Sequence, residues 1–238
     1  MKHAIAIIIP AYNESTVIGR VLSEIPRNIT VRGKTKSIIT IVVDDGSVDK
    51  TNDVVRKHKN VHLITHVINM GAGAATRTGL HYARSIGVDI AVTMDADGQH
   101  HIKDTVTLIK KLYSDKSVDV VIGSRLLNSK GMPWYRVVGN KGLSFITFLL
   151  FGVSVTDSQS GLKAFNHKAL ENIEYTSNNF AFCSEMLWSA KKASLKIIEL
   201  PIRAIYTDYS IKKGQTNWDV YHILSELIKN RFASFIHE

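Results

Sequence analysis

The chain has 238 residues, 45% hydrophobic and 21% charged, which is enough for one large domain with a well-filled core. Its net charge of +9 favours an anionic partner, namely nucleic acid, an acidic membrane face or a phosphorylated substrate, although solubility alone explains a basic surface equally well. The single cysteine, Cys183, excludes an intrachain disulfide and fits a reducing cytoplasm.

The first apolar stretch, "MKHAIAIIIPAYNE", is followed by polar residues and has no small-residue cleavage site, so it predicts a buried strand and not a signal peptide. The most apolar later stretch, 143–155, is shorter than the roughly 20 residues that cross a bilayer. We therefore expect a soluble or peripheral protein in the cytoplasm, without an integral membrane segment.

Strand and helix patterns alternate through the first half of the chain. Runs of Val and Ile without polar alternation are typical of strands covered on both faces, hence of a parallel sheet with right-handed crossover helices. We predict an α/β, doubly wound fold. Its strands are expected at 4–10, 37–45, 61–66, 89–95 and 118–124, and its helices at 14–25, 49–58, 72–86 and 102–113.

The regular alternation of strand and helix patterns ends after Ser124. A loop with mixed charge is expected over 125–142, before an apolar helix around 143–151. Pro201 indicates an edge or an end of the later strand. A second helix is expected at 184–193, that strand at 195–206, a basic loop at 207–217 and a last helix at 220–235. Without repeats or a Pro-rich linker, 1–238 is predicted to be a single domain.

Polar residues gather where the predicted strands end, and ligands of open parallel sheets bind outside these carboxyl ends. One such group would be explained by helix capping, but five groups are not. They comprise Pro10, Tyr12, Asn13 and Glu14; Asp44 and Asp45; Asn69, Gly71 and Gly73; Asp95, Asp97 and Gln99; and Gly123, Ser124 and Arg125.

In "VTMDADGQH" extended backbone would turn Asp95, Asp97 and Gln99 toward one point. A divalent cation would offset the repulsion between the two carboxylates, and Mg²⁺ or Mn²⁺ suits such oxygen ligands together with a diphosphate. A solvated turn is the alternative. The chain lacks GxGxxG after its first strand and GxxxxGK[ST] anywhere, which argues against dinucleotide and P-loop sites. His100 and His101 have no spaced partners that would indicate zinc.

The ordered motifs "IPAYNE", "VVDDGSVDKT", "NMGAGAATRTG", "MDADGQH", "GSR" and "TDSQSGLKAF" resemble family 2 glycosyltransferases, and more narrowly those that load a sugar onto polyprenyl (dolichyl or undecaprenyl) phosphate. The resemblance implies a GT-A-type, mostly parallel, Rossmann-like twisted sheet with helices on both faces. It also implies a nucleotide-sugar-binding half, 1–125, and an acceptor and membrane-facing half, 126–238. Two departures are Ala72, where the family often has Lys, and the missing Pro after the DxD motif.

For the donor, the resemblance implies an inverting, metal-dependent transfer of a hexose or N-acetylhexosamine, with a UDP-sugar slightly favoured over GDP-mannose. Asp95 would lie near the ribose and the metal, and Asp97 and Gln99 would ligate the cation. Pro10, Tyr12 and Glu14 would hold the nucleoside, and Asp44 would accept hydrogen bonds from the base or ribose.

A phosphate acceptor is already ionised and needs positioning instead of a general base, which suits arginine. Arg125 and Arg136 are the candidates, with Lys212 and Lys213 over the diphosphate. If the acceptor were a glycan or protein hydroxyl, Asp157 and Glu185 would be the candidate bases. A nucleic-acid-binding protein and a catalytically silent nucleotide-sugar-binding subunit are the alternatives of another class.

A peripheral membrane contact, or one through a membrane-anchored partner, is also expected. Trp134, Tyr135, Arg136 and Lys141 precede the apolar helix, and aromatic and basic residues beside such a helix suit an anionic lipid surface. Core packing of that helix is the alternative. A membrane contact would place the protein at the cytoplasmic face of the membrane.

Overall fold

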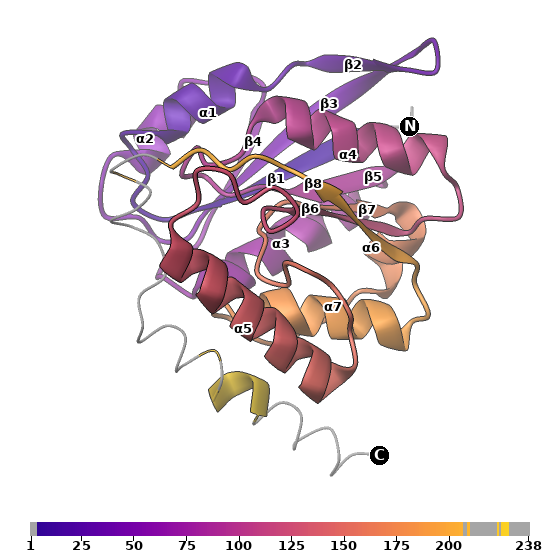
Figure 1. Cartoon of the computed structure of the whole chain (residues 1–238). Helices are drawn as coiled ribbons and strands as arrows, with labels where there is room; N and C mark the ends of the chain where they lie inside the picture. The colour runs from indigo at the N-terminus through magenta and orange to yellow at the C-terminus, as the bar shows by residue number, and fades with distance from the viewer. Residues whose placement is uncertain (1–3, 207–208, 210–222, 224, 229–238) are drawn as a thin grey trace.

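A single twisted sheet forms the centre of the computed structural model, which describes residues 4–206, 209, 223 and 225–228 (Figure 1). The strand order is β2-β3-β1-β5-β7-β6-β8, and β4 pairs with β3. The strands are β1 (Ile5–Ala11), β2 (Asn28–Val31), β3 (Lys34–Asp44), β4 (Val61–Thr65), β5 (Ile90–Thr93), β6 (Val120–Ser124), β7 (Lys163–Asn166) and β8 (Ile197–Pro201).

Helices cover both faces of this sheet, as predicted (Figure 1). They are α1 (Ile18–Glu24), α2 (Thr51–Arg56), α3 (Ala72–Ser85), α4 (Ile102–Ser114), α5 (Trp134–Phe151), α6 (His167–Asn172) and α7 (Phe182–Lys192). Strand β1 shows how one sequence serves two cores: Ile5, Ile7 and Ile9 pack with α1, α2 and α4, whereas Ala6 and Ile8 pack with α3 and α5–α7. All five side chains are buried, since successive side chains of a strand point to opposite faces.

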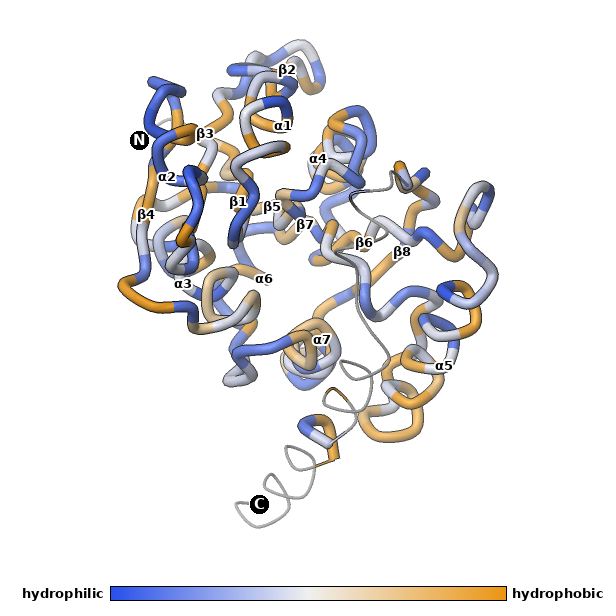
Figure 2. The backbone as a smooth tube through the Cα atoms, turned by 90° about the vertical axis from the view of Figure 1, so that its left-hand side faces the viewer, coloured by the Kyte–Doolittle hydropathy of each residue, from blue (hydrophilic) through white to orange (hydrophobic). Residues whose placement is uncertain are grey.

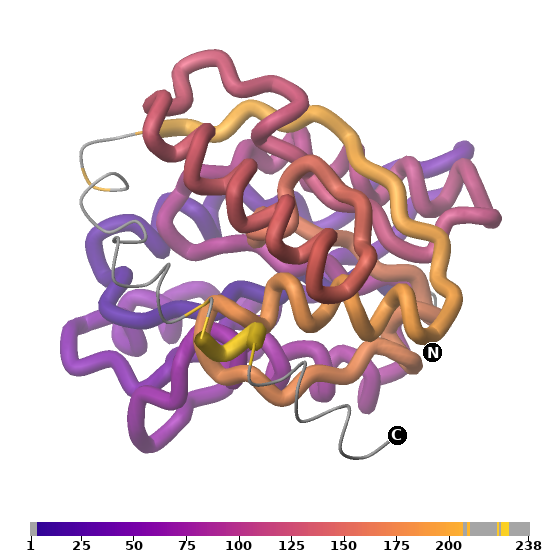
Figure 3. Tube along the Cα trace, turned by 60° about the horizontal axis from the view of Figure 1, so that its bottom comes forward, coloured from indigo at the N-terminus to yellow at the C-terminus, as the bar shows by residue number. Residues whose placement is uncertain are grey.

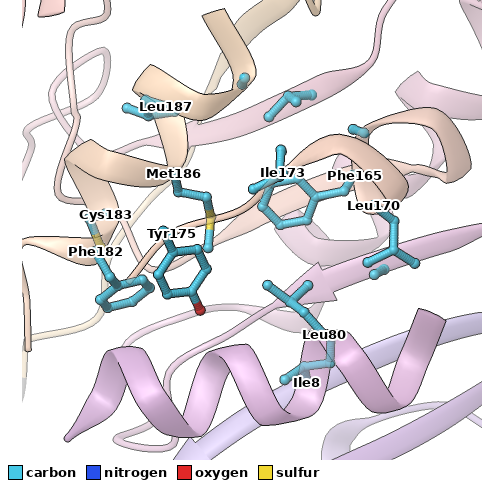
Figure 4. Close-up of a cluster of buried hydrophobic side chains, with 14 of the residues drawn as sticks. Ile8, Leu80, Phe165, Leu170, Ile173, Tyr175, Phe182, Cys183, Met186 and Leu187 are labelled. Carbon is cyan, nitrogen blue, oxygen red and sulfur yellow. The ribbon is translucent and has the colours of Figure 1, made fainter. Parts of the chain in front are cut away.

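The core on the α3 side contains larger side chains toward α7. Leu80 of α3, Phe165 of β7 and Met186 of α7 converge beneath the sheet (Figure 4). Tyr175 and Phe182 add two rings whose centroids lie 5.6 Å apart. This cluster fixes α7 relative to α3, and both helices also reach the carboxyl ends of the strands.

The sheet is mixed, which refines the predicted mostly parallel sheet. Pairs β1/β3, β1/β5, β3/β4 and β6/β8 are parallel. Strand β7 runs antiparallel between β5 and β6, and β2 pairs antiparallel with β3. Neither β2 nor β7 was predicted, because each has only four residues and too little of a period to recognise.

The loop predicted over 125–142 is wrong in its second half, because α5 already begins at Trp134, directly after Pro133. Proline is favoured at a helix start, and Gly152, with φ 63°, ends the helix in the left-handed conformation. The strand predicted at 195–206 is confirmed only as Ile197–Pro201. Most of the helix predicted at 220–235 lies outside the described residues. Within the described part of the chain, no helix combines the length and apolarity needed to cross a membrane.

Candidate active site

A cavity of about 640 Å³ opens at the carboxyl ends of β1, β3, β5 and β6, where the sequence places its polar residues. The loops after β1, β3, β5 and β6 form part of its wall. The segment from Asn69 into α3, helix α5, the 159–161 turn and the segment from Asn179 into α7 contribute as well. The predicted site residues on this wall are Pro10, Tyr12, Glu14, Asp95, Asp97, Gln99, Arg125 and Arg136. The structure therefore brings together eight residues that were singled out from four separate stretches of sequence.

The DxD segment forms a turn and does not continue as extended backbone. Gly98 has φ 75°, a left-handed conformation that glycine adopts without strain. The turn lets the backbone N–H of Gln99 donate to Asp97 Oδ1 at 2.9 Å, while its side-chain Nε2 donates to Oδ2 at 2.6 Å. Gln99 thus holds the Asp97 carboxylate through its amide nitrogen.

The two carboxylates of the DxD segment differ electrostatically. Burial in the cleft and the nearby charge of Asp95 raise the pKa of Asp97 to about 6. Burial alone would also raise the pKa of Asp95, but the hydrogen bond and charge of His100 outweigh it, so that this pKa is lowered. His100 Nε2 lies 3.0 Å from Asp95 Oδ2. Because the charge of Asp95 raises the pKa of Asp97, the two carboxylates repel each other, and a bound cation would stabilise both in the ionised form.

The 159–161 turn brings backbone unusually close to Asp95. A Cβ atom on Gly161 would clash with both carboxylate oxygens of Asp95, so a larger residue here would displace the Asp95 side chain. Thr93 Oγ1 donates to the Gly161 carbonyl at 2.8 Å and fixes the turn to the end of β5. The "QSG" segment of the sequence therefore packs against Asp95, the first aspartate of the DxD segment.

Arg125 is held by Asp157 in a bidentate ion pair. Its Nε and Nη2 donate to the two Asp157 oxygens at 2.8 and 2.9 Å, and its backbone N–H adds a third bond at 3.0 Å. The Asp157 side chain is fully buried. Burial alone would raise the pKa of Asp157, but the charge of Arg125 and its hydrogen bonds outweigh burial and lower it. Asp157 is not on the cavity wall, and it presents Arg125 there.

Arg136 reaches the same cavity from the first turn of α5. Its guanidinium lies 5.7 Å from the ring centroid of Tyr206, within cation–π range. Tyr206 was not singled out from the sequence, because no spacing rule links it to a residue seventy positions earlier. Two arginines and two aspartates thus line the same cavity.

Of the two aspartates at the end of β3, Asp45 lines the cavity wall and Asp44 does not. Asp44 is 1% exposed, and its oxygens accept hydrogen bonds from Ser47 N at 3.0 Å and Asn52 Nδ2 at 3.1 Å. Neighbouring strand residues point to opposite sides, and the sequence "DD" does not reveal which one faces the ligand. Asp45, which the sequence placed among the strand-end residues without a role of its own, is therefore the member of the pair that lines the cavity.

Gly71 and Gly73 are required by a strap, residues 175–179, that crosses the start of α3. The backbone N–H groups of Gly73 and Ala74 donate to Asn178 O at 2.7 and 3.3 Å. A Cβ atom on Gly71 would clash with Asn178 O. Glu185, a candidate base in the sequence, instead accepts from Thr176 N and Ser177 N at 3.1 and 2.8 Å, and it lies outside the cavity wall.

Lys212 and Lys213 lie outside the described residues. Within the residues that the structure describes, no group of three or more His, Cys, Asp or Glu side chains is arranged to hold a metal. Asp95 and Asp97 can supply two carboxylate ligands, and two such ligands are typical of Mg²⁺ sites completed by water and substrate phosphate oxygens.

A mixed α/β sheet covered on both faces, with a carboxylate-bearing cavity at its carboxyl edge, is the architecture of GT-A glycosyltransferases. Solved structures agree: glucosyl-3-phosphoglycerate synthase from Mycobacterium tuberculosis, in complex with Mn²⁺, UDP-glucose and glycerol 3-phosphate, superposes with a TM-score of 0.68 at 17% identity. The match covers 97% of this chain and 80% of that one.

The chain belongs to Glycosyl transferase family 2, whose profile matches residues 6–174. It is 42% identical to the UDP-N-acetylglucosamine–dolichyl-phosphate N-acetylglucosaminyltransferase of Methanococcus voltae, over 88% of this chain and 89% of that protein. It is 28% identical to the polyprenol monophosphomannose synthase of Mycolicibacterium smegmatis, over 87% and 79% of the two chains. The protein is thus a glycosyltransferase, and relatives named for lipid-phosphate acceptors are among its matches.

Proposed function

We propose that the protein transfers a hexose or N-acetylhexosamine from a nucleoside-diphosphate sugar to polyprenyl phosphate, with inversion at the sugar carbon and a bound Mg²⁺ or Mn²⁺. The observation that carries this proposal is one cavity whose wall carries both Asp95 and Asp97 and both Arg125 and Arg136. The first pair suits a metal–diphosphate donor, and the second pair suits an anionic acceptor.

The metal would be held by Asp95 and Asp97. Such an ion supplies neutralisation of the charge that develops on the leaving diphosphate. Gln99 holds Asp97 in place through two hydrogen bonds, and His100 holds Asp95. These neighbours orient the two carboxylates before the donor arrives, so little ordering is left for the binding step.

A phosphate acceptor fits the cavity better than a hydroxyl acceptor, which needs a general base. Both candidate bases are occupied elsewhere: Asp157 is fully buried in its ion pair with Arg125, and Glu185 caps the strap. An ionised phosphate oxygen attacks without a base once Arg125 and Arg136 position it. Attack from the face opposite the leaving diphosphate would invert the anomeric centre.

The donor's nucleoside would lie against Pro10, Tyr12 and Glu14, which line the cavity at the carboxyl end of β1. Asp44 was expected to contact the base or ribose, but the position of Asp45 on the wall supports assigning this role to Asp45 instead. A UDP-sugar is favoured because the relative from Methanococcus voltae is named for UDP-N-acetylglucosamine. Residues 1–125 would thus form the donor half and 126–238 the acceptor half.

The acceptor half would approach the cytoplasmic face of a membrane through α5. One side of this helix lines the cavity with Tyr135, Arg136, Asn140 and Leu143. Its outer side is apolar and exposed, as the orange colour of α5 in Figure 2 indicates. A helix that is apolar outside and reaches the active site inside would carry a lipid phosphate from the bilayer to the arginines.

Calorimetric titration tests the donor site. UDP-N-acetylglucosamine, UDP-glucose and GDP-mannose are each titrated with Mn²⁺ and with EDTA, into wild type and Asp97→Asn. We expect one donor to bind in Mn²⁺ only, and its affinity to fall at least about tenfold in Asp97→Asn, because a metal ligand that is neutral no longer offsets the cation's charge. Metal-independent binding that Asp97→Asn leaves unchanged would contradict the metal assignment.

The acceptor is tested by transfer of that sugar to polyprenyl phosphate, with Arg136→Ala and Asp157→Asn as variants. We expect Arg136→Ala to raise the KM for polyprenyl phosphate without weakening donor binding. Transfer to a glycan or protein hydroxyl that Arg136→Ala leaves unchanged would support the rival acceptor and reject ours.

A further inference from the structure

His66, the residue after β4, lies between the cavity and helix α3. Its Nδ1 lies 2.7 Å from Asp45 Oδ1, and its Nε2 lies 3.0 Å from Thr78 Oγ1. The Asp45 carboxylate only accepts hydrogen bonds, so Nδ1 carries the proton and donates it. The His66 side chain is 10% exposed and the Asp45 side chain 3% exposed, so this link is shielded from water.

The same carboxylate holds the loop before α3. Asp45 Oδ1 accepts from Met70 N at 3.0 Å, and Oδ2 accepts from Gly71 N at 2.8 Å. Asp45, Asn69 and Gly71 all line the cavity. One histidine therefore fixes an acceptor group and, through it, two further stretches of cavity wall.

We propose that His66 is a positioning residue for the donor's nucleoside: it holds the Asp45 carboxylate and the Asn69–Gly71 backbone in the arrangement that the nucleoside contacts. This inference rests on the proposed function, because it assigns this end of the cavity to the nucleoside. His66 itself does not line the cavity, so it acts through Asp45. Its loss affects the binding of the donor and leaves the acceptor side unchanged.

The chain offers a matched control on the same two elements. His62 lies four residues earlier on β4, and its Nδ1 is 2.8 Å from the hydroxyl of Tyr82, which lies four residues after Thr78 on α3. Both histidines thus link the β4 strand to α3, but only His66 also holds a cavity residue. His62 is exposed and the His66 side chain is only 10% exposed, so a purely structural role predicts that any loss of affinity follows the loss of thermal stability in each variant.

The test measures the Kd of UDP and of GDP with Mn²⁺ for wild type, His66→Ala, His66→Asn and His62→Ala, together with the thermal midpoint of each. We expect the Kd of the nucleotide that wild type binds to rise about tenfold in His66→Ala, because the Asp45 carboxylate then loses the group that holds it in place. His66→Asn keeps a donor at the δ position and should restore most of the affinity. His62→Ala should bind as wild type does.

The outcomes separate the two proposals. If wild type binds neither nucleotide in Mn²⁺, the proposed function fails and this inference fails with it. If wild type binds one nucleotide, and both His66→Ala and His66→Asn bind it with the wild-type Kd, only the positioning role is overturned. An equal loss in His66→Ala and His62→Ala, following the fall in thermal midpoint, likewise overturns it. Should His66→Ala not fold, His66→Leu takes its place, because leucine removes the donor and keeps most of the volume. An affinity at least about threefold lower in His66→Leu than in His66→Asn then supports the positioning role, and equal affinities overturn it.

Discussion

At the scale of single residues, the Arg125–Asp157 pair couples stability to the active site. Asp157 is fully buried, so removing its partner leaves an unpaired charge in the interior. We expect Arg125→Gln to lower the free energy of unfolding at pH 7 by about 3–5 kcal/mol. Urea unfolding of both proteins measures this loss. The matched change Lys111→Gln breaks a half-exposed i,i+4 pair with Asp115 and should cost about 0.5 kcal/mol or less.

The pH dependence of this loss follows from the direction of the Asp157 pKa. The pKa is lowered in the folded wild type, so the folded state binds fewer protons than the unfolded state at acidic pH. The contribution of the pair is therefore complete above the unfolded pKa, near pH 4, and decreases as the pH falls through the folded pKa. The difference between wild type and Arg125→Gln should shrink below about pH 4. A difference that grows on acidification would show that the pair is not what stabilises the fold.

Residue types at strand ends made much of the site predictable, but the direction of single side chains was not. Asp95, Asp97 and Arg125 lie where the sequence predicts, because the ends of β5 and β6 follow unmistakable apolar runs. Which of Asp44 and Asp45 lines the cavity depends on the face of the sheet to which each side chain points, and the sequence does not reveal this. Glu185 could not be assigned, because its partners Thr176 and Ser177 belong to an irregular strap.

At the scale of elements, the packing of α3 against the strap depends on Gly73. A Cβ atom there would clash with the carbonyl oxygen of Ser177, and the backbone of Asn178 blocks any retreat. We expect Gly73→Ala to destabilise the fold by about 1–3 kcal/mol, as overpacking does, and to raise the donor KM by displacing Asn179 and Phe180 from the cavity wall. Thermal unfolding and donor kinetics measure the two effects.

Gly142→Ala is the control, because Gly142 lies in α5 with nothing within 4 Å of an added Cβ. Alanine there should leave the free energy of unfolding unchanged or raise it by roughly 0.5–1 kcal/mol, as expected in a helix interior. If both variants behave alike, the strap does not depend on close approach at Gly73.

Short elements explain why the sheet was predicted only in part. The parallel pairs around β1 follow from long Val and Ile runs, which fix both faces at once. Strand β7 has four residues, and its place between β5 and β6 depends on pairing with strands about 40 and 70 residues away in sequence. Pairing with distant strands produces no recognisable hydrophobic pattern within the four residues of β7. The order of the strands at the carboxyl edge, and so the shape of the cavity, becomes visible only in the structure.

At the scale of the whole molecule, the apolar side of α5 is separated from both cores. Figure 3 shows α5 and α7 side by side. Both pack on the face of the sheet opposite α1 and α4 (Figure 1). Residues Trp134, Val138, Phe145 and Leu149 are 77, 61, 60 and 63% exposed. Their spacing of four, seven and four places them on one stripe of the helix. A continuous exposed apolar stripe on a basic protein is typical of a surface that contacts anionic lipid.

This stripe predicts how the protein binds vesicles. Burying one large apolar side chain contributes roughly 1.5–3 kcal/mol, so Phe145→Ser should weaken binding to vesicles with anionic lipid about tenfold or more. Trp134 fluorescence should shift to the blue on binding, and cosedimentation gives the affinity. Val67→Ser is the control, because Val67 is 98% exposed but lies outside α5. If Phe145→Ser binds vesicles as well as Val67→Ser and wild type do, the exposed stripe of α5 is not the membrane contact.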